Sequence, residues 1–289
     1  MENMNSQSVV KNSKSNFASS FRFLSGEKRD ALDSIYAYCR ITDDLVDLAP
    51  TPEEAKQKLD AWRKETLKAF KESTDDPVLR ELAETVRIFH IPQEYFQQLL
   101  EGVRMDLEIK VYGTFEELYT YCYKVASVVG LMCIEVFGYK DPKTKEYAVN
   151  LGVAFQITNI LRDIRSDSGR GRIYVPAEDL YKFALKSEDL LTLSGSSSDI
   201  KPEKAKQLRE LVNFECKRAE FYYRKAKECL DTKDRSNLVA AEVMSAVYRA
   251  ILVKIKNDPM AVFESKVRLG KCEKYLRVLQ GWLVNRFRV

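Results

Sequence analysis

Residues 156–167 read QITNILRDIRSD, and this stretch decides how the rest of the chain is interpreted. In a helix, a spacing of four residues places Asn159, Asp163 and Asp167 along one face, with Gln156 one turn earlier. Two carboxylates and an amide oxygen form a hard, all-oxygen ligand set. Such a set suits Mg²⁺ shared with a substrate phosphate, because Mg²⁺ keeps several waters and usually takes only one or two protein carboxylates. The stretch therefore predicts a helix that presents a metal and phosphate site.

A second acidic stretch lies far upstream, where residues 36–47 read YAYCRITDDLVD. Here Tyr36, Arg40, Asp43 (with Asp44) and Asp47 share a helical face. Two acidic faces on two helices, if they face each other, would bind a diphosphate through several metal ions.

An alternative is that both acidic faces are ordinary solvated helix surface. With 43 acidic residues in 289, acidic pairs four residues apart also arise by chance, and most of those are solvated. The neighbours argue against this alternative, because apolar residues such as Leu45, Ile157 and Ile164 flank the acids. A solvated face would alternate Glu with Lys, whereas these faces carry Arg, amide and phenol groups. The metal–diphosphate interpretation is therefore favoured.

The composition is typical of a globular protein with a sizeable core, since 45% of the 289 residues are hydrophobic. The net charge of +4 is mild and does not indicate nucleic-acid binding. The first residues lack the basic and apolar segments of a signal peptide, and no run of about 18 apolar residues predicts a membrane span. The six cysteines form no CxxC pair, so we expect reduced thiols, mostly packed in the core of a cytoplasmic protein.

Histidine is nearly absent, because His90 is the only one in the chain. Its scarcity excludes multi-histidine metal sites and the Glu-x-x-His pairs of di-iron bundles. His90 precedes Ile91-Pro92 at an expected helix junction, where a structural role is favoured over a catalytic one. The chemistry therefore has to use carboxylates, phenols, arginines and bound metal.

Helical periodicity without strand alternation predicts one all-α domain over residues 1–289. Thr51 and Thr114, each followed three residues later by Glu, are expected N-caps, and Ser187 is another. The expected long helices are 26–48, 52–71, 77 onward, 92–112, 115 onward, 142–167, 202–231, 235–257 and 261–287, with short helices after Pro176 and Ser187.

Three segments beyond the acidic faces are candidates for contact with a ligand. The cluster Ser13, Lys14, Ser15 and Asn16 is compatible with phosphate binding and equally with a helix cap. The loop SGRGR at 168–172 is expected to be mobile, with arginines that reach a phosphate. The stretch 115–139 is apolar nearly all round and should be central, with the small side chains of 126–130 leaving room for a neighbouring helix or for a cavity.

The last helix is unusually basic. From Pro259 to Val289 there are seven Lys/Arg and two Glu, a balance of +5. Tyr275, Leu276 and Leu279 are among the apolar residues that recur at helical spacing. This pattern is typical of a surface helix packed on the core. The alternative is peripheral contact with anionic lipid.

Four motifs together resemble the squalene/phytoene synthase family, the head-to-head isoprenoid synthases. They are YAYCRITDDLVD, YCYKVASVVGLM, QITNILRDIRSD and GRIYVP, in the order and at the spacing of that family. The resemblance covers essentially the full chain, and the run VASVVGLMCIEVFG is closest to bacterial enzymes that make presqualene diphosphate or squalene. It implies an all-α isoprenoid synthase fold around a central apolar cavity.

The resemblance also implies roles for individual residues. The implied Mg²⁺ ligands are Asp43, Asp47, Asn159, Asp163 and Asp167. The implied contacts to the diphosphates are Ser13, Lys14, Ser15, Asn16, Tyr36, Arg40, Gln156 and Arg162. Tyr121 matches the catalytic tyrosine of the family, and Tyr248 matches a substrate-contacting one.

The function implied by the resemblance is a Mg²⁺-dependent transferase. It would join two farnesyl diphosphates head to head into presqualene diphosphate, with onward conversion to squalene or dehydrosqualene, as in hopanoid synthesis, left open. The nearest rival is phytoene synthase, which uses geranylgeranyl diphosphate for carotenoid synthesis. A more distant rival is a non-catalytic lipid-binding or membrane-docking module. No nucleotide site is recognisable, so the use of NADPH is not predicted either way, nor is the oligomeric state.

Overall fold

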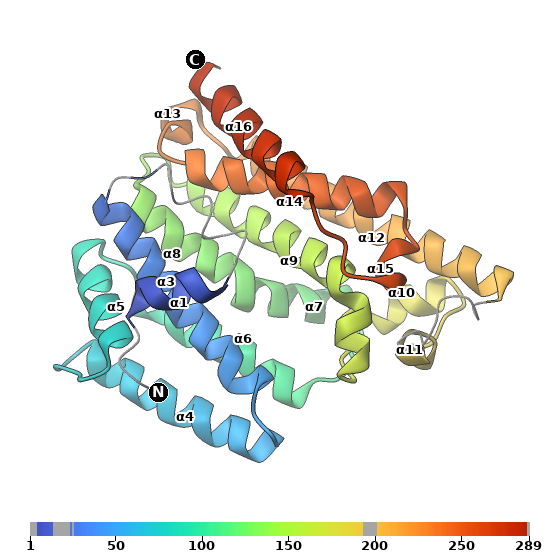
Figure 1. Ribbon diagram of the computed structural model, residues 1–289, viewed down its shortest axis with the longest axis horizontal. Helices are drawn as coiled ribbons and strands as arrows, with labels where there is room; N and C mark the ends of the chain where they lie inside the picture. The colour runs from blue at the N-terminus through green and yellow to red at the C-terminus, as the bar shows by residue number, and fades with distance from the viewer. Residues whose placement is uncertain (1–4, 14–23, 25, 193–200, 288–289) are drawn as a thin grey trace.

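The computed structural model describes residues 5–13, 24, 26–192 and 201–287, with the side chains of Ser13, Lys271, Gln280 and 282–287 outside that description. The described chain is helical and contains no β-strand, in agreement with the predicted fold class (Figure 1). The helices are α1 (Ser6–Ser13), α3 (Gly26–Asp47), α4 (Pro52–Ala69), α5 (Pro77–Ile88), α6 (Gln93–Glu108), α7 (Phe115–Cys122), the π-helical turn η2 (Tyr123–Ser127), α8 (Val128–Phe137), α9 (Thr144–Gly169), α10 (Ala177–Lys182), α11 (Ser187–Leu191), α12 (Pro202–Glu228), α13 (Thr232–Arg235), α14 (Val239–Asn257), α15 (Ala261–Glu264) and α16 (Lys271–Phe287).

Side-chain caps begin three of the helices that the sequence predicted, namely α4, α5 and α7. Thr51 accepts the amide of Glu54 at 3.2 Å, and Thr114 accepts the amide of Glu117 at 3.3 Å. The prediction for Ser187 is wrong, because Ser187 is already the first residue of α11. The Asp189 carboxylate, which accepts the Lys186 amide at 2.8 Å, stabilises that helix start instead.

The C-terminal region departs from the single helix predicted over 261–287. The chain forms the short helix α15, leaves helical geometry at Ser265, and begins α16 only at Lys271. Tyr275, Leu276 and Leu279 of α16 are exposed, so these apolar residues do not form the face that packs on α14. The backbone at Gly281 makes the close contact instead, since a Cβ there would lie 3.0 Å from the Cα of Val243.

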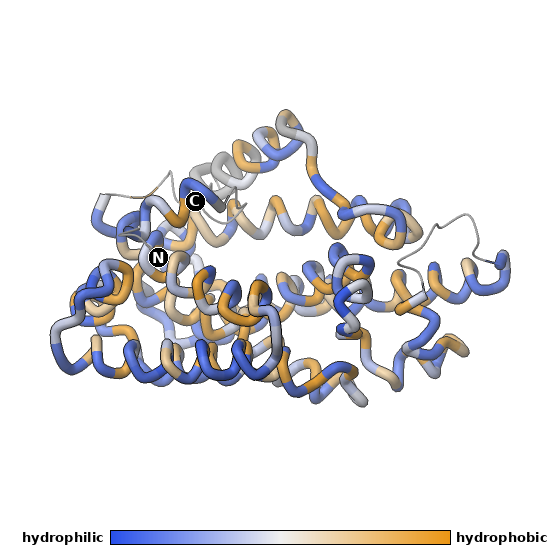
Figure 2. Tube along the Cα trace, turned by 60° about the horizontal axis from the view of Figure 1, so that its bottom comes forward, coloured by the Kyte–Doolittle hydropathy of each residue, from blue (hydrophilic) through white to orange (hydrophobic). Residues whose placement is uncertain are grey.

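The core is organised around α9, which crosses the middle of the molecule between α8, α12 and α14 (Figure 1). Most other helices alternate hydrophobic and hydrophilic segments, as expected when one face is turned to a core (Figure 2). The start of α9 is anchored by the fully buried Asp234, which accepts the amides of Lys140 and Asp141 at 2.7 and 2.9 Å. This anchor sets the position of the acidic face at the other end of the helix.

Two glycines let the π-helical turn η2 approach its neighbours closely. A Cβ at Gly152 of α9 would lie 2.5 Å from the Cα of Ser127, and a Cβ at Gly102 of α6 would lie 2.7 Å from the Cβ of Lys124. π-Helical turns are rare in proteins, and those that do occur are often found at functional sites. This one begins two residues after Tyr121, so its close packing helps to determine where that side chain points.

We expect Gly152→Ala to destabilise the protein by about 1–3 kcal/mol, because the contacting atoms at Ser127 are backbone and cannot move aside cheaply. Urea unfolding measures the change. Gly169→Ala in the same helix is the matched control, because a Cβ there meets no atom within 4 Å. A Gly152→Ala variant as stable as Gly169→Ala would contradict the close approach.

The helical stretch Phe115–Phe137 is long and apolar enough, by length and composition, to cross a membrane. Lys124 and Glu135 interrupt its apolar run, which is why the sequence contains no uninterrupted span. In the structure 56% of its most apolar window is buried inside the protein, against α3, α6 and α9. This central position is the one predicted from the sequence. The two alternatives for its small residues, room for a neighbouring helix and room for a cavity, both apply. Ser127 packs on α9, while Ala126 and Gly130 line a cavity.

Candidate active site

Two adjoining cavities lie beside α9, one between α3, α6 and α9 and the other between α3, α8, α9 and α14. The first, here called the mouth, has a volume of about 430 Å³ and is lined mainly by charged side chains. The second, here called the tunnel, has a volume of about 270 Å³ and is lined mainly by apolar side chains. Asp43, Val125, Gln156 and Asn159 line both, so the mouth and the tunnel adjoin at these side chains.

The two acidic faces predicted from the sequence meet across the mouth. Asp43 and Asp47 reach it from α3, and Asn159, Asp163 and Asp167 reach it from α9. In each helix the spacing of four residues is what places the side chains on the side that faces the cavity. The predicted diphosphate contacts Arg40, Gln156 and Arg162 line the same cavity.

Arginines of the loop after α9 hold the carboxylate of Asp47. Arg170 Nη1 donates to Asp47 Oδ2 at 3.0 Å, and Arg172 Nη1 donates to Asp47 Oδ1 at 2.7 Å. Burial acts to lower the pKa of Arg172, but the hydrogen bond to Asp47 and nearby negative charges raise it above the usual value. The loop that the sequence predicted to carry phosphate-binding arginines therefore closes one side of the mouth.

Asp163 is also neutralised by the cations around it. Lys266 Nζ lies 2.9 Å from Asp163 Oδ1, and Arg162 Nη2 lies 2.5 Å from Asp163 Oδ2. Burial acts to raise the pKa of Asp163, but Arg162 and Lys266 outweigh it and hold the pKa below the usual value. In all, six acidic and five basic side chains line the mouth. The mouth therefore suits a magnesium–diphosphate complex, in which the charges largely cancel, better than it suits free Mg²⁺ or free diphosphate.

Asp43 and Asp167 have no ion-pair partner in the described part of the chain. Burial and repulsion from Asp106 and Asp47 raise the pKa of Asp43 to about 7, although its side chain is open to solvent through the mouth. Burial and repulsion from Asp163 raise the pKa of Asp167 to about 7. Both carboxylates would be stabilised by a cation.

The oxygen donors of the mouth fit Mg²⁺. Asn159 Oδ1 is buried and accepts no hydrogen bond within the described chain, so an acceptor next to the acids is free for a ligand. No three acidic, histidine or cysteine side chains among the described residues come close enough to enclose an ion on their own. This agrees with Mg²⁺ shared between one or two carboxylates and a phosphate, rather than with a cage made only of protein.

A group of hydrogen-bonded phenols lines the mouth. Tyr121 Oη donates to Asp106 Oδ2 at 3.1 Å, and Tyr174 Oη donates to Asp106 Oδ1 at 2.7 Å. The rings of Tyr121 and Tyr174 stack with centroids 5.2 Å apart. Burial and the adjacent Asp106 hold the pKa of Tyr121 well above its usual value, and burial raises the pKa of Asp106 to about 6. At neutral pH Tyr121 is therefore a neutral phenol that donates to a carboxylate.

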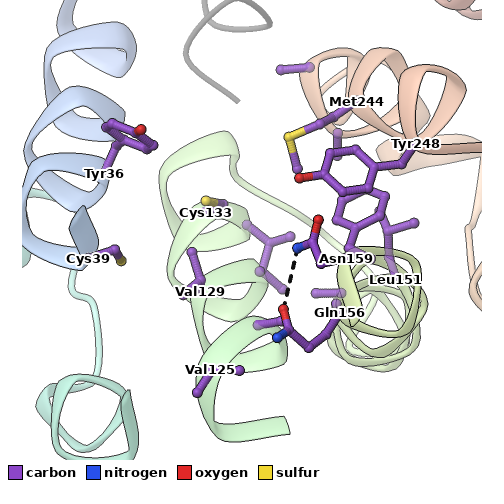
Figure 3. A pocket seen from close by; sticks show the side chains of 18 of the residues that line it. Tyr36, Cys39, Val125, Val129, Cys133, Leu151, Gln156, Asn159, Met244 and Tyr248 are labelled. Atoms are coloured by element: carbon purple, nitrogen blue, oxygen red, sulfur yellow. Dashed lines mark hydrogen bonds between the residues drawn. The ribbon is translucent and has the colours of Figure 1, made fainter. Parts of the chain in front are cut away.

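The tunnel walls come from four segments (Figure 3). Tyr36 and Cys39 of α3 face Val125, Val129 and Cys133 of η2 and α8 across the cavity. The opposite wall is formed by α9 and α14, with labelled residues Leu151, Gln156, Asn159, Met244 and Tyr248. The ring of Tyr248 packs on that of Phe155 with centroids 4.5 Å apart. The charged mouth thus adjoins a tunnel whose walls consist of aliphatic and aromatic side chains.

Residues 10–273 match the family profile described as squalene/phytoene synthase. The chain belongs to the squalene/phytoene synthase family. It is 34% identical over 268 residues to a phytoene synthase of Mycobacterium tuberculosis, covering 93% of this chain and 86% of the relative. It is also 34% identical over 262 residues to a phytoene synthase of Arthrospira platensis, covering 86% of this chain and 82% of the relative.

Solved structures of the squalene/phytoene synthase family have the same fold. A dehydrosqualene synthase in complex with ligand superposes with a TM-score of 0.83 at 26% identity, covering 97% of this chain and 95% of that one. A squalene synthase from Alicyclobacillus acidocaldarius superposes with a TM-score of 0.75 at 26% identity, covering 87% of this chain and 92% of that one. Members of this family are prenyltransferases, so the resemblance noted in the sequence is confirmed at the level of family and fold.

Apart from the cluster 13–16, every residue predicted for the site lines the mouth or the tunnel. Tyr36 and Tyr248 line the tunnel, and the other described residues line the mouth. The exception concerns the predicted phosphate-binding cluster 13–16. Lys14, Ser15 and Asn16 lie outside the described residues, and Ser13 is described only as the last residue of α1.

Sequence reasoning missed three side chains of this family site, namely Asp106, Tyr174 and Lys266, which all line the mouth. Asp106 and Lys266 come from segments without a motif of their own. In α6 the spacing of Asp106 from its neighbours does not distinguish it from a solvated acid. The motif GRIYVP contained Tyr174, but nothing in the pattern indicated that its hydroxyl reaches Asp106.

Proposed function

We propose that this protein joins two farnesyl diphosphates head to head into presqualene diphosphate in a Mg²⁺-dependent reaction. The observation that carries the proposal is the connection between the acidic, arginine-rich mouth and the apolar tunnel. A prenyl diphosphate has the same two parts, a charged head and an apolar chain. Prenyl diphosphates are the substrates of this family, which supports the choice of substrate class.

Asp43, Asp47, Asn159, Asp163 and Asp167 are the residues that would hold Mg²⁺. Bound there, Mg²⁺ would neutralise the negative charge that develops on the departing diphosphate. Arg170 and Arg172, which hold Asp47 in this structure, lie where they would meet the same phosphate oxygens. Arg40, paired with Asp44 at 2.6 Å on the surface of the mouth, is a further cation for the second diphosphate.

The tunnel and the phenol group account for the steps after diphosphate leaves. The allylic C–O bond breaks with its electron pair going to diphosphate, and the double bond of the second substrate attacks the resulting cation. Aromatic and aliphatic walls exclude water, which would otherwise capture the cation. Ring closure to the cyclopropane then releases one proton. We assign it to Tyr121, whose own proton passes to Asp106 along the existing hydrogen bond.

Tyr121→Phe tests that assignment. We expect kcat to fall by about 10²-fold with little change in KM, because general-base catalysis contributes on that scale. Tyr174→Phe is the control, since it removes the other hydrogen bond to Asp106 but leaves Tyr121 in place. Its kcat should remain within about tenfold of the wild type. A Tyr121→Phe variant with nearly full kcat would assign the proton to the released diphosphate instead.

The choice of farnesyl follows the solved structures at 26% identity, a dehydrosqualene synthase and a squalene synthase, and the tunnel is long enough for a farnesyl chain. Tyr147, whose side chain is 1% exposed, lines the far end, twelve residues before Asn159 in α9. At 1.5 Å per residue this places it about 18 Å from the mouth. For bonds near 1.5 Å, an extended farnesyl chain spans about 14 Å and a geranylgeranyl chain about 19 Å. A second candidate is phytoene synthesis from geranylgeranyl diphosphate, because the relatives at 34% identity are named phytoene synthases.

Product analysis tests the proposal directly. The purified protein is incubated with farnesyl or geranylgeranyl diphosphate and Mg²⁺, with and without NADPH, and the extracts are analysed by mass spectrometry. We expect presqualene diphosphate from farnesyl diphosphate, and squalene in addition only if NADPH is used. Phytoene from geranylgeranyl diphosphate alone would establish the second candidate. Consumption of neither substrate would contradict the enzymatic proposal and favour a lipid-binding module.

A further inference from the structure

A third cavity lies directly behind the far end of the tunnel. It has a volume of about 360 Å³ and lies among α9, α12, α14 and α16. Tyr147 and Leu151 of α9 line both this cavity and the tunnel, so these two side chains separate the two spaces. The helix α14 forms the other boundary, with Ala240 and Ala241 on the tunnel side and Ala246 and Arg249 on the far side.

Tyr147 is the larger part of this partition and is firmly held. Its ring is 1% exposed, and its Oη donates to Glu242 Oε1 at 2.6 Å, from α9 across to α14. The tunnel face of α14 at this level consists of the methyl groups of Ala240 and Ala241, which leave space that the ring of Tyr147 fills. No large side chain of α14 before Met244 lines the tunnel.

We propose that Tyr147, held by Glu242, forms the floor of the tunnel and sets the longest prenyl chain that the enzyme accepts. This inference rests on the proposed function, and it names the residue that determines specificity. A chain one isoprene unit too long would have to displace a buried, hydrogen-bonded ring. Without the ring, the tunnel would continue into the third cavity, where Leu151, Ala246 and Ala250 offer apolar contacts to the extra unit beside charged side chains such as Arg249 and Arg277.

The experiment compares the wild type with Tyr147→Ala by competition between farnesyl and geranylgeranyl diphosphates. We expect the kcat/KM ratio of the longer to the shorter substrate to rise by about 10- to 100-fold, on the scale by which hydrophobic pockets discriminate chain length. If the wild type already prefers geranylgeranyl diphosphate, the same rise is expected for the substrate one isoprene unit longer. An unchanged ratio in a folded Tyr147→Ala variant would overturn the inference.

Two further variants separate the size of the ring from its hydrogen bond. Tyr147→Phe keeps the ring and removes the bond to Glu242, so its ratio should equal that of the wild type within about twofold. Ala241→Leu narrows the same end of the tunnel from α14 and should shift the ratio toward the shorter substrate. If Tyr147→Ala does not fold, the test is made with Tyr147→Leu and Ala241→Leu. A kcat/KM ratio of the longer to the shorter substrate that equals the wild-type ratio in both variants would overturn the inference.

The wild type distinguishes failure of this inference from failure of the proposed function. Wild-type turnover of a prenyl diphosphate together with unmoved ratios in the variants would reject Tyr147 as the floor and leave the function intact. No turnover of any prenyl diphosphate by the wild type would reject the function itself. Calorimetry with Mg²⁺ and non-hydrolysable thiodiphosphate analogues of both lengths measures the preference as a ratio of dissociation constants. This measurement does not depend on catalysis.

Discussion

Asp43→Asn is expected to lower kcat by at least about 10³-fold, an increase in the activation free energy of about 4 kcal/mol. Asp43 lines both the mouth and the tunnel, so it lies where the diphosphate joins the prenyl chain. It has no ion-pair partner in the described part of the chain, so its charge is free to stabilise a bound cation. Loss of that charge should raise the free energy most in the transition state in which the diphosphate leaves. Steady-state kinetics with farnesyl diphosphate measure the effect.

The same substitution should not harm the fold. Burial and neighbouring carboxylates raise the pKa of Asp43 to about 7, which means that the folded protein disfavours the charged form. Asn has the same shape without the charge, so the melting temperature without Mg²⁺ should equal or exceed that of the wild type. Stabilisation by added Mg²⁺ and diphosphate should be reduced. A variant that is inactive because it is unfolded would show the opposite pattern.

Asp44→Asn is the matched control, with the same change of charge at the next residue. Asp44 is paired with Arg40 at the edge of the mouth, and exposed ion pairs contribute little. We expect its kcat to fall by less than about tenfold. Equal losses in Asp43→Asn and Asp44→Asn would indicate that overall charge, rather than the position of Asp43, controls activity.

Arg218→Met is expected to destabilise the protein by about 3–5 kcal/mol, the usual cost of leaving buried charges without their partner. Arg218 of α12 donates to Asp179 Oδ2 at 2.6 Å and Oδ1 at 3.1 Å, and to Glu215 Oε1 at 2.6 Å. Asp179 and Glu215 are 4% and 3% exposed. Asp179 belongs to α10, shortly after the loop that carries Arg170 and Arg172, so this cluster fixes that loop to α12.

The loss of stability should depend on pH. Burial raises the pKa of Glu215 to about 7 even with Arg218 present, and removal of the cation should raise it further. A carboxyl group with a folded-state pKa above its unfolded value favours folding at low pH and loses that contribution as pH rises through the folded-state pKa. The deficit of Arg218→Met should therefore be largest above pH 7 and smaller near pH 5 to 6. Urea unfolding at several pH values measures it.

Arg224→Met in the same helix provides the comparison for Arg218→Met. Arg224 is exposed, and its guanidinium carbon lies 5.6 Å from the centre of the Phe221 ring. We expect a change below about 1 kcal/mol, independent of pH. A similar loss in both variants would mean that α12 is sensitive to any substitution and that the buried cluster has no special role.

The predictions from sequence succeeded where a local repeat determines geometry. The spacing of four residues in α3 and α9 is sufficient to place Asp43 with Asp47, and Asn159 with Asp163 and Asp167, on common faces. Capping residues succeeded for the same reason, since Thr51 and Thr114 act on amides three residues away. These statements depend only on helix geometry.

The predictions failed where the outcome depends on contacts between distant segments. The sequence predicts a single helix over 261–287, yet the chain leaves helical geometry at Ser265, and Lys266 in this interruption forms an ion pair with Asp163. Asp106 shows no sequence signal, because its partners Tyr121 and Tyr174 lie on other segments.

The sequence by itself determined the helical class, the two acidic faces and their likeness to one family. Only the tertiary structure decided that the mouth adjoins an apolar tunnel, that the cations of the mouth hold several of its carboxylates, and that Tyr147 lines the tunnel while it donates to Glu242. The physical reason is distance along the chain. Helix periodicity acts over a few residues, whereas the depth of a cavity depends on side chains from helices that meet only after folding.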